Sequence, residues 1–206
     1  MSASRIAGVI LAGGLSRRMG GGDKSLLSLG ERPILSRVID RLRPQVETLV
    51  LNANGDPSRF AQFGLPVVSD PVDGFAGPLS GVLAGLDRAA SQGYAQIVTV
   101  AADTPFFPDD LTTRLAEAAA AAQTPLSCAR TDGRDHPTFG LWSVALADDL
   151  RAALTEEGLR KVVLWTERHG CARADFPVGA YDPFFNVNTP DDMAEALSIL
   201  NAERSA

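Results

Sequence analysis

The fold is decided by the stretch Ile6-Ala-Gly-Val-Ile-Leu-Ala-Gly-Gly-Leu-Ser-Arg-Arg-Met-Gly-Gly-Gly-Asp-Lys24, near the start of the chain. Its first six residues are apolar without interruption, which is typical of a parallel strand covered on both faces. The glycines that follow permit positive φ angles and let backbone N–H groups approach a ligand closely. Arg17, Arg18 and Lys24 add cations beside the same turn. The pattern therefore predicts a strand that ends in an anion-binding loop, most readily one for phosphates.

This loop matches neither of two common phosphate-binding motifs. It lacks the Gly-x-x-x-x-Gly-Lys-Ser/Thr spacing of the Walker A loop. It also lacks Gly-x-Gly-x-x-Gly after the strand, the fingerprint of dinucleotide-binding proteins. A flexible turn is the alternative interpretation of a bare glycine pair. The flanking strand and the three cations favour an anion site of another kind.

Composition indicates an ordinary globular protein. The chain has 206 residues, of which 45% are hydrophobic and 21% charged, so we expect a single domain spanning 1–206. A net charge of −6 argues against nucleic acid as a partner, and no apolar run approaches the roughly 18 residues that span a membrane. The start of the chain does not resemble a secretory signal peptide. Cys128 and Cys171 have no CxxC or metal-ligand spacing, so we expect reduced thiols and a cytoplasmic location.

Helical and strand patterns alternate along the chain. Helices are expected at 33–42, 79–90, 111–122, 146–154, 160–168 and from 190 onwards, and further strands at 47–52, 66–70, 95–102 and 138–142. Thr189 is expected to cap the last helix, with Pro190 in its first turn. The alternation predicts an α/β fold, a three-layer α/β/α Rossmann-like sandwich with a mainly parallel sheet.

Four of the expected strands end in glycine or polar residues, namely Gly13, Asn52, Asp70 and Asp103. Ligands of open α/β sheets bind at the carboxyl ends of the strands. We therefore expect these four residues to converge on one edge of the sheet and to form the site.

Asp103 follows an apolar strand and precedes Thr-Pro, which ends the strand. A carboxylate beside a phosphate site is a natural ligand for Mg²⁺, which prefers few carboxylates together with phosphate oxygens and water. The alternative is a turn aspartate that accepts backbone N–H groups. The neighbouring glycine-rich loop favours the metal.

The remaining candidates concern a base and a second substrate. Asp70 accepts hydrogen bonds only, so Asp70 and Asn52 suit a ribose or the N–H groups of guanine; capping of the following loop is the alternative. His136 lacks a visible histidine or cysteine partner, which is weak evidence for a metal or a catalytic base. A second anionic substrate and a solvated surface are equally good explanations of four further cations, Arg130, Arg134, Arg160 and Lys161.

Seven motifs, in this order and at these strand ends, form a specific set: Leu11-Ala-Gly-Gly-x-Ser-x-Arg-Met-Gly-x-x-Asp-Lys24, Asn52-Ala-Asn54, Asp70, Gly77-Pro-Leu-x-Gly81, Asp103-Thr-Pro105, Asp135-His-Pro137 and Phe185-Asn-Val-Asn-Thr-Pro190. Together they resemble the molybdenum cofactor guanylyltransferase family, within the sugar-nucleotide-transferase-like nucleotidyltransferases. The resemblance covers nearly the whole chain. It implies the nucleotide-diphospho-sugar transferase-like fold and transfer of GMP from Mg·GTP to molybdopterin, which gives molybdopterin guanine dinucleotide and pyrophosphate. It also implies transient contact with proteins that donate or accept the molybdenum cofactor.

The resemblance further implies roles for individual residues. The GTP-binding residues would be Leu11, Ala12, Gly13, Gly14, Lys24, Asn52, Asp70 and Asp103. Catalysis would depend on Lys24, Asp103 and Arg18, and Asp103 would also bind Mg²⁺. The acceptor side would include Arg134, His136, Arg160, Asn186 and Asn188.

Two rival functions remain at the level of sequence. In molybdopterin cytidylyltransferases the corresponding loop resembles Leu-Ala-Ala-Gly, whereas this chain has Gly13 in place of the second alanine. A glycine leaves more room for a purine, which favours GTP over CTP. The other rival is a binding module that delivers a cofactor without chemistry, and Asp103 beside the glycine-rich loop argues against it.

Overall fold

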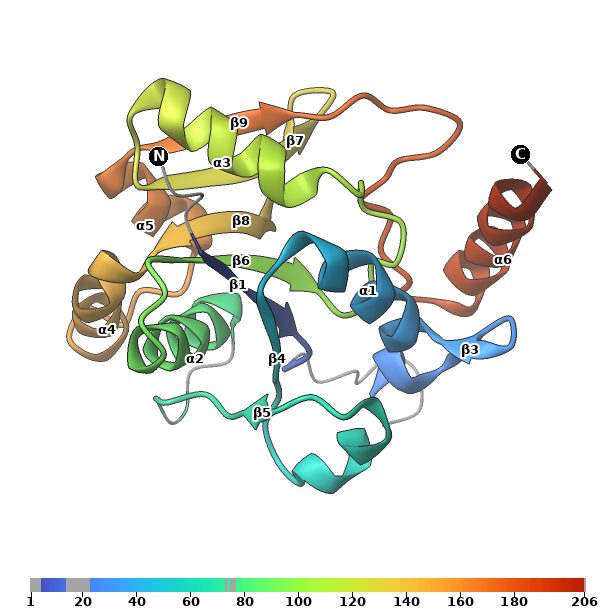
Figure 1. Cartoon of the computed structure of the whole chain (residues 1–206), viewed down its shortest axis with the longest axis horizontal. Coiled ribbons are helices and arrows are strands. Elements are labelled where there is room, and N and C mark those ends of the chain that lie inside the picture. Colours follow the sequence, from blue (N-terminus) through green and yellow to red (C-terminus); the bar gives the residue numbers. More distant parts are fainter. Residues whose placement is uncertain (1–4, 14–22, 73, 75–76, 206) are drawn as a thin grey trace.

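The computed structural model describes residues 5–13, 23–72, 74 and 77–205 of the chain. Seven strands form one sheet in the order β5-β4-β1-β6-β8-β7-β9 (Figure 1). Their bounds are β1 Ile6–Leu11, β4 Thr48–Asn52, β5 Val67–Val68, β6 Gln96–Ala101, β7 Leu126–Thr131, β8 Arg134–Ser143 and β9 Cys171–Asp175. Only β8 runs antiparallel to its neighbours, so the predicted mainly parallel sheet is confirmed.

β1 lies in the interior of the sheet and has parallel partners on both sides, β4 and β6. Alternate residues of β1 enter different cores, with Ile10 on one face and Val9 on the other. Because both faces are covered, the strand is apolar at every position, as its sequence predicts.

Helices cover both faces of the sheet, which confirms the three-layer sandwich (Figure 1). One core contains side chains of α1 (Ile34–Leu42), α3 (Leu111–Ala122) and α6 (Pro190–Ser205). The other contains side chains of α2 (Pro78–Ser91), α4 (Ala147–Thr155) and α5 (Val162–His169). Within the described part of the chain, every helix is too short or too polar to cross a lipid bilayer.

Three elements were not predicted from the sequence. They are β7, β9 and a short hairpin of β2 (Ser28–Leu29) and β3 (Arg32–Pro33). The residues of β9, Cys-Ala-Arg-Ala-Asp, include no β-branched or aromatic side chain, so local propensity does not mark it as a strand. Parallel pairing with β7 makes it one. The expected strand at 66–70 is also shorter than predicted, because only Val67 and Val68 pair with β4.

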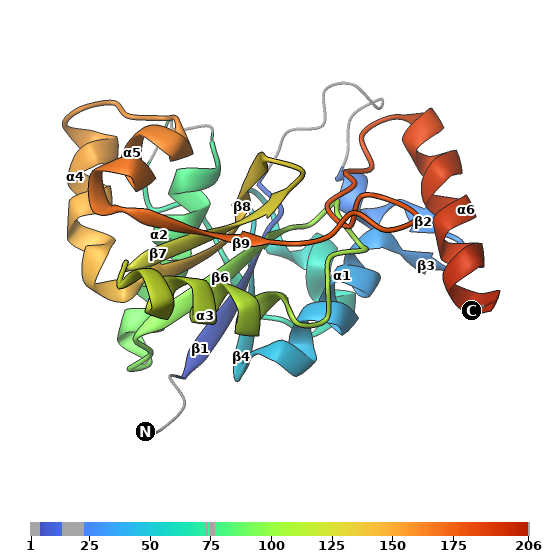
Figure 2. The same cartoon turned by 90° about the horizontal axis from the view of Figure 1, so that it is seen from above.

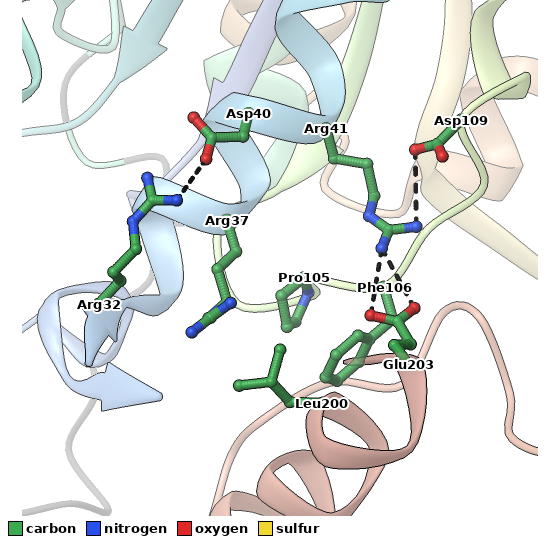
Figure 3. Close-up of a pocket in the computed structure, with 9 residues that line it drawn as sticks. All are labelled: Arg32, Arg37, Asp40, Arg41, Pro105, Phe106, Asp109, Leu200 and Glu203. Atoms are coloured by element: carbon green, nitrogen blue, oxygen red, sulfur yellow. Dashed lines mark hydrogen bonds and ion pairs between the residues drawn. The ribbon is translucent and has the colours of Figure 1, made fainter. Parts of the chain in front are cut away.

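An ion pair beside a cavity of about 240 Å³ joins the last helix to the first (Figure 3). The Arg41 guanidinium lies 3.2 Å from a Glu203 carboxylate oxygen and donates to the Phe107 carbonyl at 3.1 Å. Arg32 pairs with Asp40 at 2.7 Å on the other side of the cavity (Figure 3). Three arginines and three acidic residues line the cavity, so the formal charges of its lining balance.

Candidate active site

The carboxyl ends of the central strands lie in one row, as predicted. Leu11 is in register with Asn52 on one side and with Ala101 on the other. The pairing extends one residue further, since Ala12 N donates to the Asn52 carbonyl and Ala102 N donates to the Leu11 carbonyl. β4 and β5 continue to one side of β1 and β6 to the other, so this row is the topological switch point of the sheet.

Asp70 is held by two asparagines on one side of this row. The Asn52 amide donates to one Asp70 carboxylate oxygen at 2.9 Å, and the Asn54 amide donates to the other at 2.8 Å. The Asn54 side-chain oxygen accepts the Asp70 N–H at 2.9 Å. An ionised carboxylate has about four acceptor positions, so two remain for a ligand. The arrangement presents a fixed acceptor to N–H groups.

The absence of a side chain at Gly81 leaves the space that the Asn52 side chain occupies. Asn52 is only 2% exposed, beneath the first turn of α2. A Cβ atom at Gly81 would lie 2.2 Å from the Asn52 side-chain oxygen, which no real structure tolerates. A Cβ atom at Gly13 would lie 3.6 Å from that oxygen, which is an ordinary contact distance. The protein itself therefore has room for alanine at position 13. A requirement for glycine there would come from contact with the ligand.

Lys24 and Asp103 meet the two late asparagines on the other side of the row. Lys24 Nζ lies 3.4 Å from Asp103 Oδ2 and donates to Asn188 Oδ1 at 2.5 Å. The Asn186 amide donates to Asp103 Oδ1 at 3.1 Å, and the Val187 N–H donates to the Asp103 carbonyl at 2.9 Å. One segment thus contacts the carboxylate, its backbone and the lysine together.

The donor atoms here fit a hard divalent cation. The side chains of Lys24 and Asp103 are 19% and 22% exposed, so the cluster is sheltered but open to a ligand. Among the described residues, histidine, cysteine, aspartate and glutamate form no group of three that could hold a metal. One carboxylate with amide oxygens, completed by water and phosphate, suits Mg²⁺ and does not suit the closed nitrogen and sulfur sites of zinc.

Arg59 joins the two sides and was not identified from the sequence. It lies in a 3₁₀ segment, Pro57–Phe63, and its Nε is 2.8 Å from an Asp23 carboxylate oxygen. Its Nη2 donates to the Asn54 carbonyl at 2.5 Å. The residue before Lys24 is therefore tied to the residue that holds Asp70. Its surroundings in the sequence are an ordinary polar turn, which carries no signal of this role.

The candidates for a second substrate are dispersed around the rim. Arg134 is exposed at the start of β8, whereas His136 is buried and stacks on Phe184 with ring centroids 4.5 Å apart. The Arg160 carbonyl lies 3.9 Å from where a Cβ at Gly77 would be, beside the start of α2. Arg130 donates to Asp135 at 2.7 Å, so it is already engaged. Gly14, Arg17 and Arg18 lie outside the described residues.

The chain is similar to proteins of known family. A family model described as the MobA-like NTP transferase domain matches residues 8–170. A molybdenum cofactor guanylyltransferase of Bradyrhizobium sp. (strain ORS 278) is 54% identical over 193 residues, which cover 93% of this chain and 91% of that protein. Another from Mesorhizobium japonicum is 50% identical over 204 residues, which cover 97% and 98% of the two chains.

The fold is also found in solved structures. The crystal structure of molybdopterin-guanine dinucleotide biosynthesis protein A from Archaeoglobus fulgidus superposes with a TM-score of 0.73 and 23% identity. The superposition covers 95% of this chain and 99% of that one. At this identity the likeness concerns the fold.

Proposed function

The chain belongs to the MobA-like NTP transferase family, among its molybdenum cofactor guanylyltransferases, and from this premise we propose that it transfers GMP from GTP to molybdopterin. The products are molybdopterin guanine dinucleotide and pyrophosphate. The observation that carries the proposal for this chain is the cluster of Lys24, Asp103, Asn186 and Asn188, set across the strand ends from the fixed carboxylate of Asp70.

Asp70 would bind the guanine base. Guanine offers two neighbouring donors, N1–H and N2–H₂, and an acceptor-only carboxylate is complementary to both. Asn52 and Asn54 orient that carboxylate without using all its acceptor positions. Cytosine presents a different edge, with a single exocyclic donor, so this geometry supports GTP over CTP.

Lys24 and Asp103 would bind the triphosphate. Lys24 supplies a positive charge at the end of the glycine-rich loop, and Leu11, Ala12 and Gly13 bring the end of β1 to the same place. Proteins of this family generally use a divalent metal ion, and we propose Mg²⁺, held by Asp103 with Asn188 nearby. When bound, the ion would neutralise charge on the phosphate oxygens.

The reaction needs no covalent enzyme intermediate. An oxygen of the molybdopterin phosphate attacks the α-phosphorus of GTP in line, and pyrophosphate leaves on the opposite side. Because the attacking phosphate is already ionised, a strong general base is unnecessary. The protein contributes positioning, and Lys24 stabilises the charge that develops on the phosphate oxygens.

The test replaces Asp103 by asparagine, which keeps the shape of the side chain and removes its charge. Pyrophosphate release is measured with GTP, molybdopterin and Mg²⁺. We expect kcat to fall by a factor of about 100 or more, the scale seen when one electrostatic contact to a transition state is lost. Circular dichroism checks that the variant folds.

Three outcomes would overturn the proposal. An unchanged rate in the Asp103→Asn variant would remove this carboxylate from the chemistry. Pyrophosphate release from CTP but not GTP would make the protein a cytidylyltransferase, and no release with either nucleotide in the unaltered protein would leave only a binding module.

A further inference from the structure

β8 contains an irregularity next to the candidate site. Cys128 of β7 pairs with Gly140, but the next residue, Ala129, pairs with His136. Residues 137–139 are therefore left over as a bulge, and pairing of β8 with β6 ends at Thr99 and Gly140. A bulge bends a strand and redirects its side chains, and it is a place where proline is tolerated, here Pro137.

Phe184 fills the space beside this bulge. It is 2% exposed and stacks on the His136 imidazole at an interplanar angle of 24°. The edges of Phe139 and Phe176 complete its surroundings, with centroid distances of 4.9 and 5.4 Å. The Phe184 N–H is accepted by Asp182 at 2.9 Å, so the backbone of the segment is fixed as well.

The segment that contains Phe184 continues directly to the cluster of Lys24, Asp103, Asn186 and Asn188. The chain runs from β9 at one edge of the sheet to α6, which lies beside the β2–β3 hairpin (Figure 2). On the way, Phe184 precedes Asn186 by two residues and Asn188 by four. These two side chains contact Asp103 and Lys24, so a displacement of Phe184 would also displace both of them.

We propose that His136 is a positioning residue, which acts through Phe184 to hold Asn186 and Asn188 against Asp103 and Lys24. The inference rests on the proposed function and replaces contact with the acceptor as the role of this histidine. Its Nε2 is 2.6 Å from the Thr131 hydroxyl, so the ring is fixed at both its edge and its face. Burial lowers the pKa of His136, as does Arg134, while Asp182 and Asp135 oppose the shift.

The test compares His136→Ala with His136→Phe. Mn²⁺ affinity in the presence of GTP, measured by electron paramagnetic resonance, reports the state of Asp103 without any turnover. We expect His136→Ala to weaken Mn²⁺ binding about tenfold or more, the usual effect of losing an outer partner of a metal ligand. His136→Phe retains an aromatic face and should restore the affinity to within about twofold of the unaltered protein.

Two further variants, one of them a control, separate positioning from general loss of stability. Leu154→Ala removes a buried side chain from the opposite core and should leave Mn²⁺ affinity unchanged. Phe184→Leu leaves the β7–β8 hairpin intact and should weaken Mn²⁺ binding as His136→Ala does, which keeps the test decisive if His136→Ala does not fold.

A contact between His136 and the acceptor predicts a different pattern. Both His136 variants would then raise the KM for molybdopterin equally and leave Mn²⁺ affinity unaltered, and that result would overturn the inference. Because Mn²⁺ and GTP binding need no acceptor, failure of the proposed GMP transfer would be recognised separately, as absence of pyrophosphate release.

Discussion

Gly81 illustrates how a single residue can shape the candidate nucleotide site by leaving room for its neighbour. Glycine inside a helix costs about 1 kcal/mol relative to alanine, so a structural reason is expected where one occurs. The reason is that Asn52 occupies the space where a Cβ would be, and Asn52 in turn orients Asp70. The glycine lowers the stability of α2, and in return the buried Asn52 amide can orient the Asp70 carboxylate.

We expect Gly81→Ala to weaken GTP binding, because the added methyl group displaces the Asn52 amide. The loss should be about tenfold or more, as for removal of a hydrogen bond to a charged group. Calorimetry on Gly81→Ala, Asn52→Ala and the double variant measures it. If the mechanism is correct, the double variant binds no worse than Asn52→Ala alone; additive losses would show that the two residues act independently.

At the scale of elements, the start of α6 controls where Asn188 lies. Thr189 caps the helix, as predicted, and its hydroxyl accepts the Asp192 N–H at 3.1 Å. Asp192 returns two contacts, accepting the N–H groups of Asn188 at 2.8 Å and of Thr189 at 2.9 Å. This reciprocal cap places the backbone of Asn188, which contacts Lys24, so the helix start supports the proposed site.

Asp192→Ala should lower both stability and turnover, and Asp191→Ala is its matched control. Both variants remove one negative charge from the first turn of α6. In the described part of the chain, the Asp192 carboxylate accepts backbone N–H groups, and no such contact is described for Asp191. A lost cap of about 1 kcal/mol lowers Tm by about 2–4 °C in a chain of this size. Thermal melts and pyrophosphate release measure the two effects, and equal losses in the two variants would attribute them to charge alone.

At the scale of the whole molecule, three strands at one end of the sheet are joined by Asp135. Arg130 of β7 and Arg173 of β9 each donate to its carboxylate at 2.7 Å. Burial raises the pKa of Asp135, but hydrogen bonds from the two arginines outweigh this and leave the pKa below its ordinary value. The same end of the sheet carries β9, which leads to Phe184, Asn186 and Asn188.

The lowered pKa of Asp135 fixes the sign of a pH effect. A carboxyl whose pKa is lower in the folded state stabilises the protein above its unfolded pKa, near 3.9, and this contribution is lost as pH falls through the folded value. Asp135→Asn should therefore lower Tm by about 2–4 °C at pH 7, as expected for partly exposed ion pairs, and the difference should shrink below about pH 4.

Asp132→Asn is the control for this prediction. Asp132 lies in the same hairpin turn at φ 45°, a conformation that asparagine also adopts readily. It should cause no pH-dependent change in Tm. A difference between Asp135→Asn and the unaltered protein that stays constant from pH 7 to pH 3 would contradict the ion-pair explanation.

Much of the fold and part of the candidate site follow from local sequence. An apolar run marks a strand covered on both faces, and a glycine or polar residue after it marks the carboxyl end, which is the signal carried by Gly13, Asn52, Asp70 and Asp103. The late pair Asn186 and Asn188 entered only through family resemblance. β7 and β9 were missed because their residues have weak strand propensity.

The sequence by itself determined the layer order, the edge of the sheet that carries the candidate site and the residues that end each strand there, because these depend on periodicity and on the chemistry of neighbouring residues. Only the tertiary structure decided that Gly81 makes room for Asn52, that Arg59 reaches Asp23, and that His136 is buried against Phe184 rather than open to solvent. The physical reason is that these are contacts between side chains far apart in the chain. Their geometry depends on how strands, bulges and loops pack together, which no local pattern encodes.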